Sequence, residues 1–288
     1  MQNQLSILVL AASGKTGRRV ADRLAAQGHA VRRASRSGDT RFDWDDRSTW
    51  ASALDGVDAA YVVYTPDLAV PAAAGAITEF VKIAKAQGVR RLVLLSGRGE
   101  VEAQRCERIV QESGLEWTIV RASWFAQNFD EGPFAELVLA GEVTLPVADG
   151  VVEPFLDVED IADVAVAALT SAGHAGEVYE VTGPRLMRFD EAVADIAAAT
   201  GRELRFVPIP MEAFRAGLDE AGVPAELADL YEYLFTTVLD GRNAHVTDGV
   251  QRALGRPARD FREYAREAAA RGAWDVSLAR ATTADTNV

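Results

Sequence analysis

The segment Ala11-Ala-Ser-Gly-Lys-Thr-Gly17 has residue types and a spacing that suit the binding of phosphate groups. Gly14 and Gly17 fill two of the three positions of a G-x-x-G-x-x-G pattern, and Ala11 fills the first. Glycines let a diphosphate approach the backbone N–H groups at a helix N-terminus, where the helix dipole adds partial positive charge. We therefore expect a diphosphate to contact Ser13, Gly14, Lys15, Thr16 and Gly17.

Two other interpretations of this segment stay open. The first is a strand-to-helix turn that binds nothing, although its place at the first such junction favours binding. The second is a P-loop, because Gly14-Lys15-Thr16 matches the end of the pattern G-x-x-x-x-G-K-[ST]. The first glycine of that pattern would fall at Val9, inside an apolar run, so the sequence disfavours hydrolysis of ATP or GTP.

The run Val31-Arg-Arg-Ala-Ser-Arg36 bears on which dinucleotide would bind. Folds that bind NAD usually place Asp or Glu at the end of the second strand, where it contacts the ribose hydroxyls. Here no acidic residue occurs before Asp39. Arg36 is suited to pair with a 2′-phosphate and Ser35 to donate a hydrogen bond, which favours NADP(H) over NAD(H). The alternative is that these arginines are simply solvated.

Asp43 and Trp44 follow the expected third strand, where an adenine ring would lie. Asp43 is suited to accept a hydrogen bond from the adenine amino group. Asp45 and Asp46 fit better as caps of the helix that follows.

No catalytic acid can be assigned from the sequence. Many short-chain dehydrogenases use a Tyr-x-x-x-Lys pair as proton donor, but the only lysines are Lys15, Lys82 and Lys85, and none lies four residues after a tyrosine. Ser96 ends a strand at the edge where such sheets bind ligands, so we expect it to contact the cofactor, and a structural role is the alternative. Leu94 stands where a nucleophile elbow needs glycine, so Ser96 is not a hydrolase nucleophile.

An aromatic segment follows another predicted strand. Trp124, Phe125 and Phe129 could form a wall of a substrate pocket, with Asn128 as a polar anchor. Aromatic residues at this spacing are more often part of a core, so both interpretations stay open.

Composition excludes several classes of protein. The formal net charge of −13 disfavours nucleic acid as a partner, because an acidic surface repels phosphate backbones. The chain has one cysteine and three separated histidines, so we expect neither a disulfide nor a metal site. No run approaches the roughly 20 apolar residues of a membrane span. We expect a cytoplasmic monomer or homodimer that binds a small-molecule substrate.

Strand and helix patterns alternate along the first half of the chain, which predicts an α/β fold with a Rossmann-type doubly wound parallel sheet. The pattern predicts strands at 5–10, 29–35, 58–64, 91–96 and 115–121, and helices at 15–27, 48–54, 71–87 and 101–113. Residues 124–150 read as irregular. Strands are expected again at 153–157 and 177–182, around a helix at 158–170. From residue 189 the chain is mainly helical, with a short strand at 205–208.

The sequence resembles the NmrA-like branch of the atypical short-chain dehydrogenase/reductases. The resemblance rests on residues 11–17, 88–96, 113–129, 155–164 and 179–184. It implies an NADP-binding Rossmann domain over residues 1–125 and 152–183. It also implies a smaller, mainly helical substrate-binding part over residues 126–151 and 184–288. Ala11 stands where the family has glycine, and Ala122 where it often has proline.

The resemblance implies one of two functions. The first is an NADPH-dependent reductase that transfers hydride to a quinone, imine, azo or conjugated carbonyl compound, with Tyr64, Thr65 and Pro66 bordering the ribose or nicotinamide. The second is a non-catalytic NADP(H)-binding redox sensor of the NmrA type. Lack of the Tyr-x-x-x-Lys pair is usual in this branch, and the listed acceptors can take their proton from solvent.

Overall fold

The computed structural model describes residues 4–276, which fold into two compact units. The first unit comprises the chain up to Ala122, Val158–Val181 and Thr247–Pro257. The second comprises Ser123–Asp157, Thr182–Val246 and the chain from Ala258 onward.

A seven-stranded parallel sheet forms the centre of the first unit, with the strand order β3-β2-β1-β4-β5-β6-β8. This is the order of a Rossmann fold, with one strand added after the sixth. The predicted fold class is therefore confirmed. The strands are β1 (Ser6–Val9), β2 (Ala30–Ser35), β3 (Thr40–Arg41), β4 (Ala59–Val62), β5 (Arg91–Gly97), β6 (Glu116–Ala122) and β8 (Glu177–Val181).

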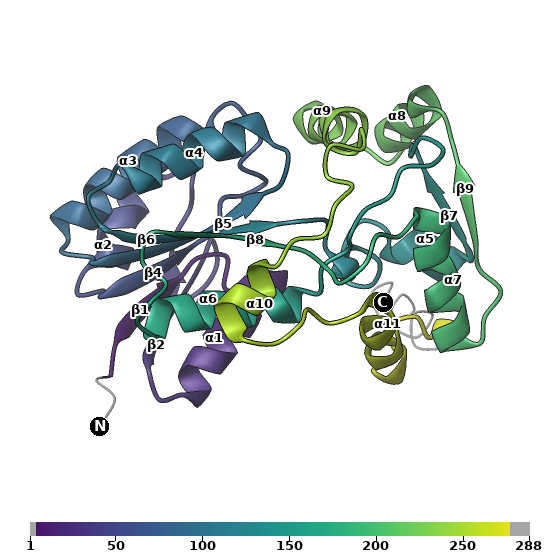
Figure 1. Cartoon of the computed structure of the whole chain (residues 1–288). Coiled ribbons are helices and arrows are strands. Elements are labelled where there is room, and N and C mark those ends of the chain that lie inside the picture. Colours follow the sequence, from purple (N-terminus) through teal and green to yellow (C-terminus); the bar gives the residue numbers. More distant parts are fainter. Residues whose placement is uncertain (1–3, 277–288) are drawn as a thin grey trace, which may run out of the picture. The chain divides into compact units, whose positions relative to one another are not determined.

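Helices cover both faces of this sheet, as Figure 1 shows. On one face lie α2 (Trp50–Leu54), α3 (Ala73–Ala86) and α4 (Val101–Gln111), and on the other α1 (Lys15–Ala26), α6 (Val158–Thr170) and α10 (Gly249–Leu254). A strand covered on both faces must be apolar on both sides. Ile7, Leu8 and Val9 of β1 are accordingly fully buried.

An aromatic cluster fills the core beneath α2 and α3. Phe42, Trp44, Trp50 and Phe80 contact one another with ring centroids 5.0–6.3 Å apart. The Trp44 indole N–H donates to the Val63 carbonyl at 3.0 Å, which satisfies its one polar atom. The short segment η1 (Arg47–Thr49) begins after Asp46, whose carboxylate accepts from the Ser48 backbone N–H and so confirms the predicted cap.

The second unit combines a two-stranded parallel sheet with helices. Its elements are η2 (Ala126–Asn128), α5 (Ala135–Ala140), β7 (Glu142–Leu145), α7 (Phe189–Thr200), β9 (Arg205–Pro208), α8 (Met211–Glu220), α9 (Ala225–Tyr233), η3 (Leu234–Val238) and α11 (Phe261–Ala270). Its core is aromatic. The Trp274 indole N–H donates to the Phe129 carbonyl at 2.7 Å, and Phe129 is fully buried.

Two local predictions were wrong here. Residues 124–150, expected to be irregular, contain the helix α5 and the strand β7, which pairs with β9 from Glu142↔Arg205 to Leu145↔Pro208. Residues 153–157, expected to form a strand, make only isolated bridges, from Glu153 to Met187 and from Leu156 to Phe125. A short strand exists only where a partner segment supplies its hydrogen bonds, and such partners are distant in sequence.

The boundaries of the two units also depend on distant contacts. Residues 247–257 return to the first unit, where α10 packs on β8. A Cβ added to Gly249 would lie only 2.1 Å from the Glu180 carbonyl oxygen, so this helix approaches the strand closely. The assignment of cofactor binding and substrate binding to separate parts of the chain stays a prediction.

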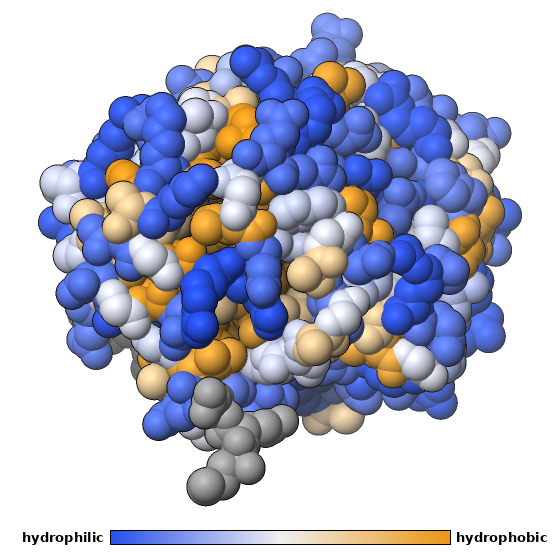
Figure 2. Space-filling view, turned by 60° about the vertical axis from the view of Figure 1, so that its left-hand side comes forward, coloured by the Kyte–Doolittle hydropathy of each residue, from blue (hydrophilic) through white to orange (hydrophobic). Residues whose placement is uncertain are grey.

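Figure 2 shows a face on which hydrophilic residues predominate and apolar residues are scattered. Scattered apolar side chains are normal on folded proteins, because polar groups cannot cover the whole surface. Among residues 4–276, no helix is long and apolar enough to cross a membrane.

Candidate functional site

The turn after β1 is held by backbone hydrogen bonds on three sides. The Gly14 N–H donates to the Ala11 carbonyl at 2.8 Å, which closes the turn. The Leu10 N–H donates to Tyr61 of β4, and the Ala12 N–H donates to Ala34 of β2, each at 3.1 Å. The turn is therefore fixed to both strands that flank β1, at the carboxyl edge of the sheet.

Ala11 has a left-handed backbone, with φ at 49°. It is the one residue other than glycine with positive φ in the described part of the chain. Alanine fills a glycine position of the pattern here without avoiding the left-handed conformation. The left-handed region costs an L-residue roughly 1–2 kcal/mol, which explains why the family pattern has glycine at this position.

Gly17 is required for packing rather than for its dihedral angles. A Cβ at this position would lie 2.2 Å from the Ala11 carbonyl oxygen and 2.9 Å from that of Leu10. The first turn of α1 therefore sits directly on the backbone of the turn. Gly14 is the N-cap residue of α1 and offers no side-chain cap, so its side chain does not compete with an anion for the backbone N–H groups of the first turn.

These features fit a diphosphate. A helix N-terminus whose N-cap is glycine, approached closely by a glycine turn, offers backbone donors and a favourable dipole. Lys15 and Thr16 lie in the same first turn, with Thr16 buried. Chemistry and geometry thus agree at the predicted residues, and contact of each one with a cofactor stays a prediction.

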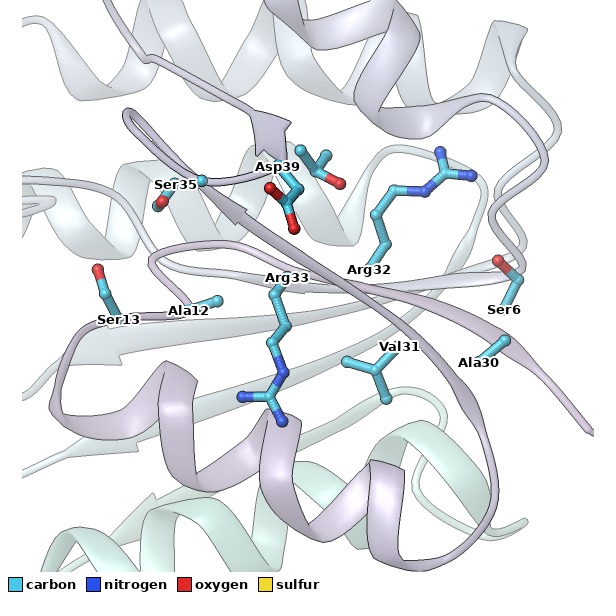
Figure 3. A pocket seen from close by; sticks show the side chains of 11 residues that line it. Ser6, Ala12, Ser13, Ala30, Val31, Arg32, Arg33, Ser35 and Asp39 are labelled. Atoms are coloured by element: carbon cyan, nitrogen blue, oxygen red, sulfur yellow. The ribbon is translucent and has the colours of Figure 1, made fainter.

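A pocket of about 700 Å³ extends from this turn along the edge of β2. Figure 3 shows Ala12 and Ser13 of the turn on one side, with Ser35 at the end of β2 and Asp39 after it. The structure therefore brings Ser13 and Ser35 into one pocket, as the cofactor hypothesis requires. The lining residues are Ser6, Ala12, Ser13, Ala30, Val31, Arg32, Arg33, Ser35, Gly38, Asp39 and Thr40.

The cation that lines this pocket beside Ser35 is Arg33, whereas Arg36 is exposed and does not line it. Figure 3 shows Arg33 extending toward α1, where its guanidinium pairs with Asp22 at 2.7 Å. Both partners are largely exposed, so the pair is weak and its guanidinium is open to competition by a phosphate. The sequence could have indicated Arg33, because Arg33 and Ser35 are two residues apart on a strand and their side chains therefore lie on the same face of the sheet.

Arg32 extends to the opposite side in Figure 3. Its guanidinium donates to the backbone carbonyls of Ala53 and Asp55 at 2.9 and 2.8 Å, which fixes the end of α2. Arg32 therefore has a structural role. Asp39 also lines the pocket, and its carboxylate is suited to a ribose hydroxyl.

Asp43 and Trp44 lie at the start of the aromatic cluster. The Asp43 carbonyl accepts from the Trp50 indole N–H at 2.6 Å, and its carboxylate accepts from the Asp45 N–H at 3.2 Å. Trp44 is partly buried and contacts Tyr64 at a centroid distance of 4.9 Å. Tyr64 is thus largely held in the core, while Thr65, joined to Pro66 by a cis peptide bond, is exposed.

Ser96 belongs to a buried network at the end of β5. Its hydroxyl donates to Glu107 Oε1 at 2.6 Å, and Glu107 also accepts from Arg121 Nε at 2.9 Å. Arg121 pairs in turn with Glu180, which also accepts from Arg98. The hydrogen bond with Glu107 raises the pKa of Arg121. This arrangement matches the structural alternative for Ser96, and its contact with a cofactor stays a prediction.

The predicted substrate residues belong to the second unit. Trp124 packs between Phe134, Phe189 and Phe235, with centroid distances of 5.2–6.2 Å. Trp124, Phe125 and Asn128 are each partly exposed, whereas Phe129 is fully buried. Phe129 is therefore part of the core, and a substrate role for the other three stays a prediction.

A family model described as NAD(P)H-binding matches residues 11–172, a span that includes the turn, all of the pocket lining except Ser6, and the strands β2–β6. The chain belongs to this NAD(P)H-binding family. The match confirms the predicted cofactor class and begins at the residue whose carbonyl closes the turn.

Two relatives of this chain are named as reductases. It is 37% identical over 238 residues to the NAD(P)H azoreductase of Xenophilus azovorans, covering 79% of this chain and 81% of that one. It is 35% identical over 287 residues to the (4-alkanoyl-5-oxo-2,5-dihydrofuran-3-yl)methyl phosphate reductase of Streptomyces griseus, covering 91% and 97%. These relatives confirm the predicted class, an NAD(P)H-dependent oxidoreductase.

The resemblance to the NmrA-like branch is also confirmed at the level of fold. The crystal structure of NmrA, a negative transcriptional regulator, in complex with NADP superposes with a TM-score of 0.69 at 17% identity. The superposition covers 93% of this chain and 95% of NmrA.

Proposed function

We propose that this protein is an NADPH-dependent reductase that transfers hydride to a small organic acceptor, such as a quinone, imine, azo or conjugated carbonyl compound. The observation that carries the proposal is the continuous pocket from the glycine turn to Arg33 and Ser35. A turn that accepts a diphosphate and a cation beside the second strand are what an NADP-type dinucleotide needs at its adenosine half. The two reductase relatives support the direction of the reaction.

The choice of NADP(H) over NAD(H) rests on the charge at the end of β2. A 2′-phosphate gains from a nearby guanidinium, and the weak pair of Arg33 with Asp22 leaves Arg33 able to change partner. Arg36, the residue predicted from the sequence, is the second candidate, because it is exposed three residues further on.

Single substitutions separate these two arginines. We expect Arg33→Ala to reduce the preference for NADPH over NADH at least about tenfold, since a charge-assisted contact is worth roughly 1.5–3 kcal/mol. Arg36→Ala tests the sequence-based prediction in the same way. Arg90→Ala is the matched control, because Arg90 is an exposed arginine next to the start of β5, at the opposite edge of the sheet. If Arg33→Ala and Arg36→Ala both keep the parent's preference for NADPH over NADH, the assignment of either arginine to the 2′-phosphate is wrong.

The chain supplies positioning and exclusion of water for hydride transfer. Binding at the carboxyl edge of a rigid sheet orients the donor and lowers the entropic cost of reaction. NADP(H), when bound, supplies the hydride. Screening NADPH oxidation against quinones, imines, azo dyes and enones tests the proposal. Lack of turnover with every class would contradict it.

A second candidate function is a non-catalytic NADP(H) sensor, which the shared fold with the regulator NmrA supports. This candidate predicts tight cofactor binding, no turnover on the same acceptor panel and capture of a protein partner. The net charge of −13 argues for a protein or small-molecule partner rather than nucleic acid.

A further inference from the structure

A carboxylate that lies outside the pocket beside β2 holds one of the cations that line it. Arg33 belongs to β2 and lines the pocket, whereas Asp22 belongs to α1 and does not line it. Arg33 Nη2 donates to Asp22 Oδ1 at 2.7 Å, and Figure 3 shows the Arg33 side chain directed toward α1. The guanidinium at the wall of the pocket therefore already has a partner within the protein.

This pair holds Arg33 less firmly than the contacts that hold its neighbour. Arg32 donates through a single nitrogen, Nη1, to the carbonyls of both Ala53 and Asp55. The contact with Asp22 is the one hydrogen bond of the Arg33 side chain within the described part of the chain. The side chains of Arg33 and Asp22 are 44% and 67% exposed, so water and salt screen their attraction. Arg33 can therefore exchange Asp22 for a stronger partner by moving its side chain alone.

A phosphate group near Ser35 is such a partner. The side chains of Arg33 and Ser35 lie on the same face of the sheet, and both residues line the pocket together with Ser13 of the glycine turn. A dinucleotide whose diphosphate contacts the turn has its adenosine ribose near the end of β2. A guanidinium binds phosphate through two parallel N–H donors, and such charge-assisted bonds are the strong ones. A ribose hydroxyl carries no charge, so it cannot displace Asp22 from Arg33.

We propose that Asp22 is a specificity-determining residue of the cofactor site, because it competes with the 2′-phosphate of NADP(H) for Arg33. This inference rests on the proposed function. Binding of NADPH breaks the pair of Asp22 with Arg33, whereas binding of NADH leaves it intact. The free energy of the pair is therefore subtracted from the binding of NADPH alone. Since specificity is a difference between two affinities, Asp22 lowers the preference for NADPH over NADH that Arg33 creates.

A purely structural role for the pair predicts a different pattern. Asp22 and Arg33 also join the helix that follows the glycine turn to the neighbouring strand. If the pair served only to hold α1 against β2, its loss would change the affinities for NADPH and NADH by the same factor, because both cofactors carry the same diphosphate. Competition for Arg33 changes the affinity for NADPH alone. The ratio of the two dissociation constants separates the two roles.

Titration calorimetry with NADPH and with NADH, at low and constant ionic strength, measures this ratio. Asp22→Asn keeps the shape of the side chain and removes its charge. We expect this change to lower the Kd for NADPH about two- to fivefold, as the loss of an exposed ion pair allows, and to leave the Kd for NADH unchanged. In the double variant Asp22→Asn/Arg33→Ala, the Kd for NADPH should equal that of Arg33→Ala, because the contested group is absent.

Glu177→Gln is the matched control. Glu177, at the start of β8, pairs with Arg252, whose side chain is 44% exposed, as is that of Arg33. The control therefore removes one negative charge from a similar pair in the same unit, and β8 lies at the opposite end of the strand order from β2 and β3. We expect it to leave both dissociation constants unchanged. A gain in NADPH affinity equal to that of Asp22→Asn would assign the effect to net charge and overturn the inference.

The remaining outcomes separate this inference from the proposed function. The inference is overturned if Asp22→Asn leaves the Kd for NADPH unchanged, changes both constants equally, or acts just as strongly in the Arg33→Ala background. Each of these results leaves the reductase in place if NADPH is oxidised by an acceptor in the screen. The expected pattern of binding, together with no turnover on any acceptor, would support the role of Asp22 and overturn the reductase.

Discussion

Replacing Gly17 with alanine is the sharpest test of how the glycine turn is built. Gly17 and Gly75 are both the third residue of their helices, α1 and α3. At Gly75 an added Cβ meets nothing within 4 Å, whereas at Gly17 it lies 2.2 Å from the Ala11 carbonyl oxygen. The two substitutions therefore make the same chemical change at the same helical position, and only one of them meets a backbone.

The two expected free energies follow from this difference. Alanine in a helix interior is favoured over glycine by about 1 kcal/mol, so Gly75→Ala should stabilise the protein by that amount. At Gly17 the same gain is opposed by a contact more than about 1 Å inside the van der Waals separation, and overpacking of this kind costs about 3 kcal/mol. The net loss is about 2 kcal/mol, so the two variants should differ by about 3 kcal/mol.

Thermal unfolding measures this difference directly. At roughly 2–4 °C per kcal/mol for a chain of this size class, Gly17→Ala should melt about 5 °C below the parent and Gly75→Ala slightly above it. Calorimetry should also show a Kd for NADPH at least about tenfold higher in Gly17→Ala, because a shift of about 1 Å exceeds hydrogen-bond tolerance. Equal stability and equal NADPH affinity in the two variants would refute the account of the turn.

Two further changes probe the same edge of the sheet. Ala11→Gly should stabilise the protein by about 0.5–1 kcal/mol in urea unfolding, because it removes left-handed strain but adds unfolded-state entropy. Ala12→Gly is the control, because Ala12 has no positive φ, and this change should destabilise the protein. If both changes shift the free energy of unfolding in the same direction, the strain argument is contradicted. Glu100→Gln should change how stability depends on pH. The pKa of Glu100 is raised in the folded protein, so its stabilising contribution is complete below about pH 4.5 and is lost as pH rises through the folded pKa. The stability of the parent relative to Glu100→Gln should therefore fall with pH by at most about 1.4 kcal/mol per unit, and a constant difference from pH 5 to 8 would refute the raised pKa of Glu100.

The amino-acid sequence by itself determined the elements whose patterns are local. Apolar runs such as Leu5 to Leu10, followed by helical periodicity, predicted β1, α1 and the other alternating elements of the sheet. Because parallel strands end at one edge, the same reasoning placed the turn at Gly14–Gly17 where ligands bind. The glycine spacing over residues 11–17 reflects steric contacts between residues close in sequence. The family pattern could therefore be recognised before any tertiary contact was known.

The tertiary structure alone decided the features that join distant segments. β7 exists because β9 pairs with it, and α10 belongs to the first unit because Gly249 fits against Glu180. The buried network at the end of β5 joins Ser96 to Glu107 and Glu107 to Arg121, and no sequence pattern links these three residues. Hydrogen bonds, burial and charge act through space over a few ångströms, so their partners are set by the folded chain and not by sequence spacing.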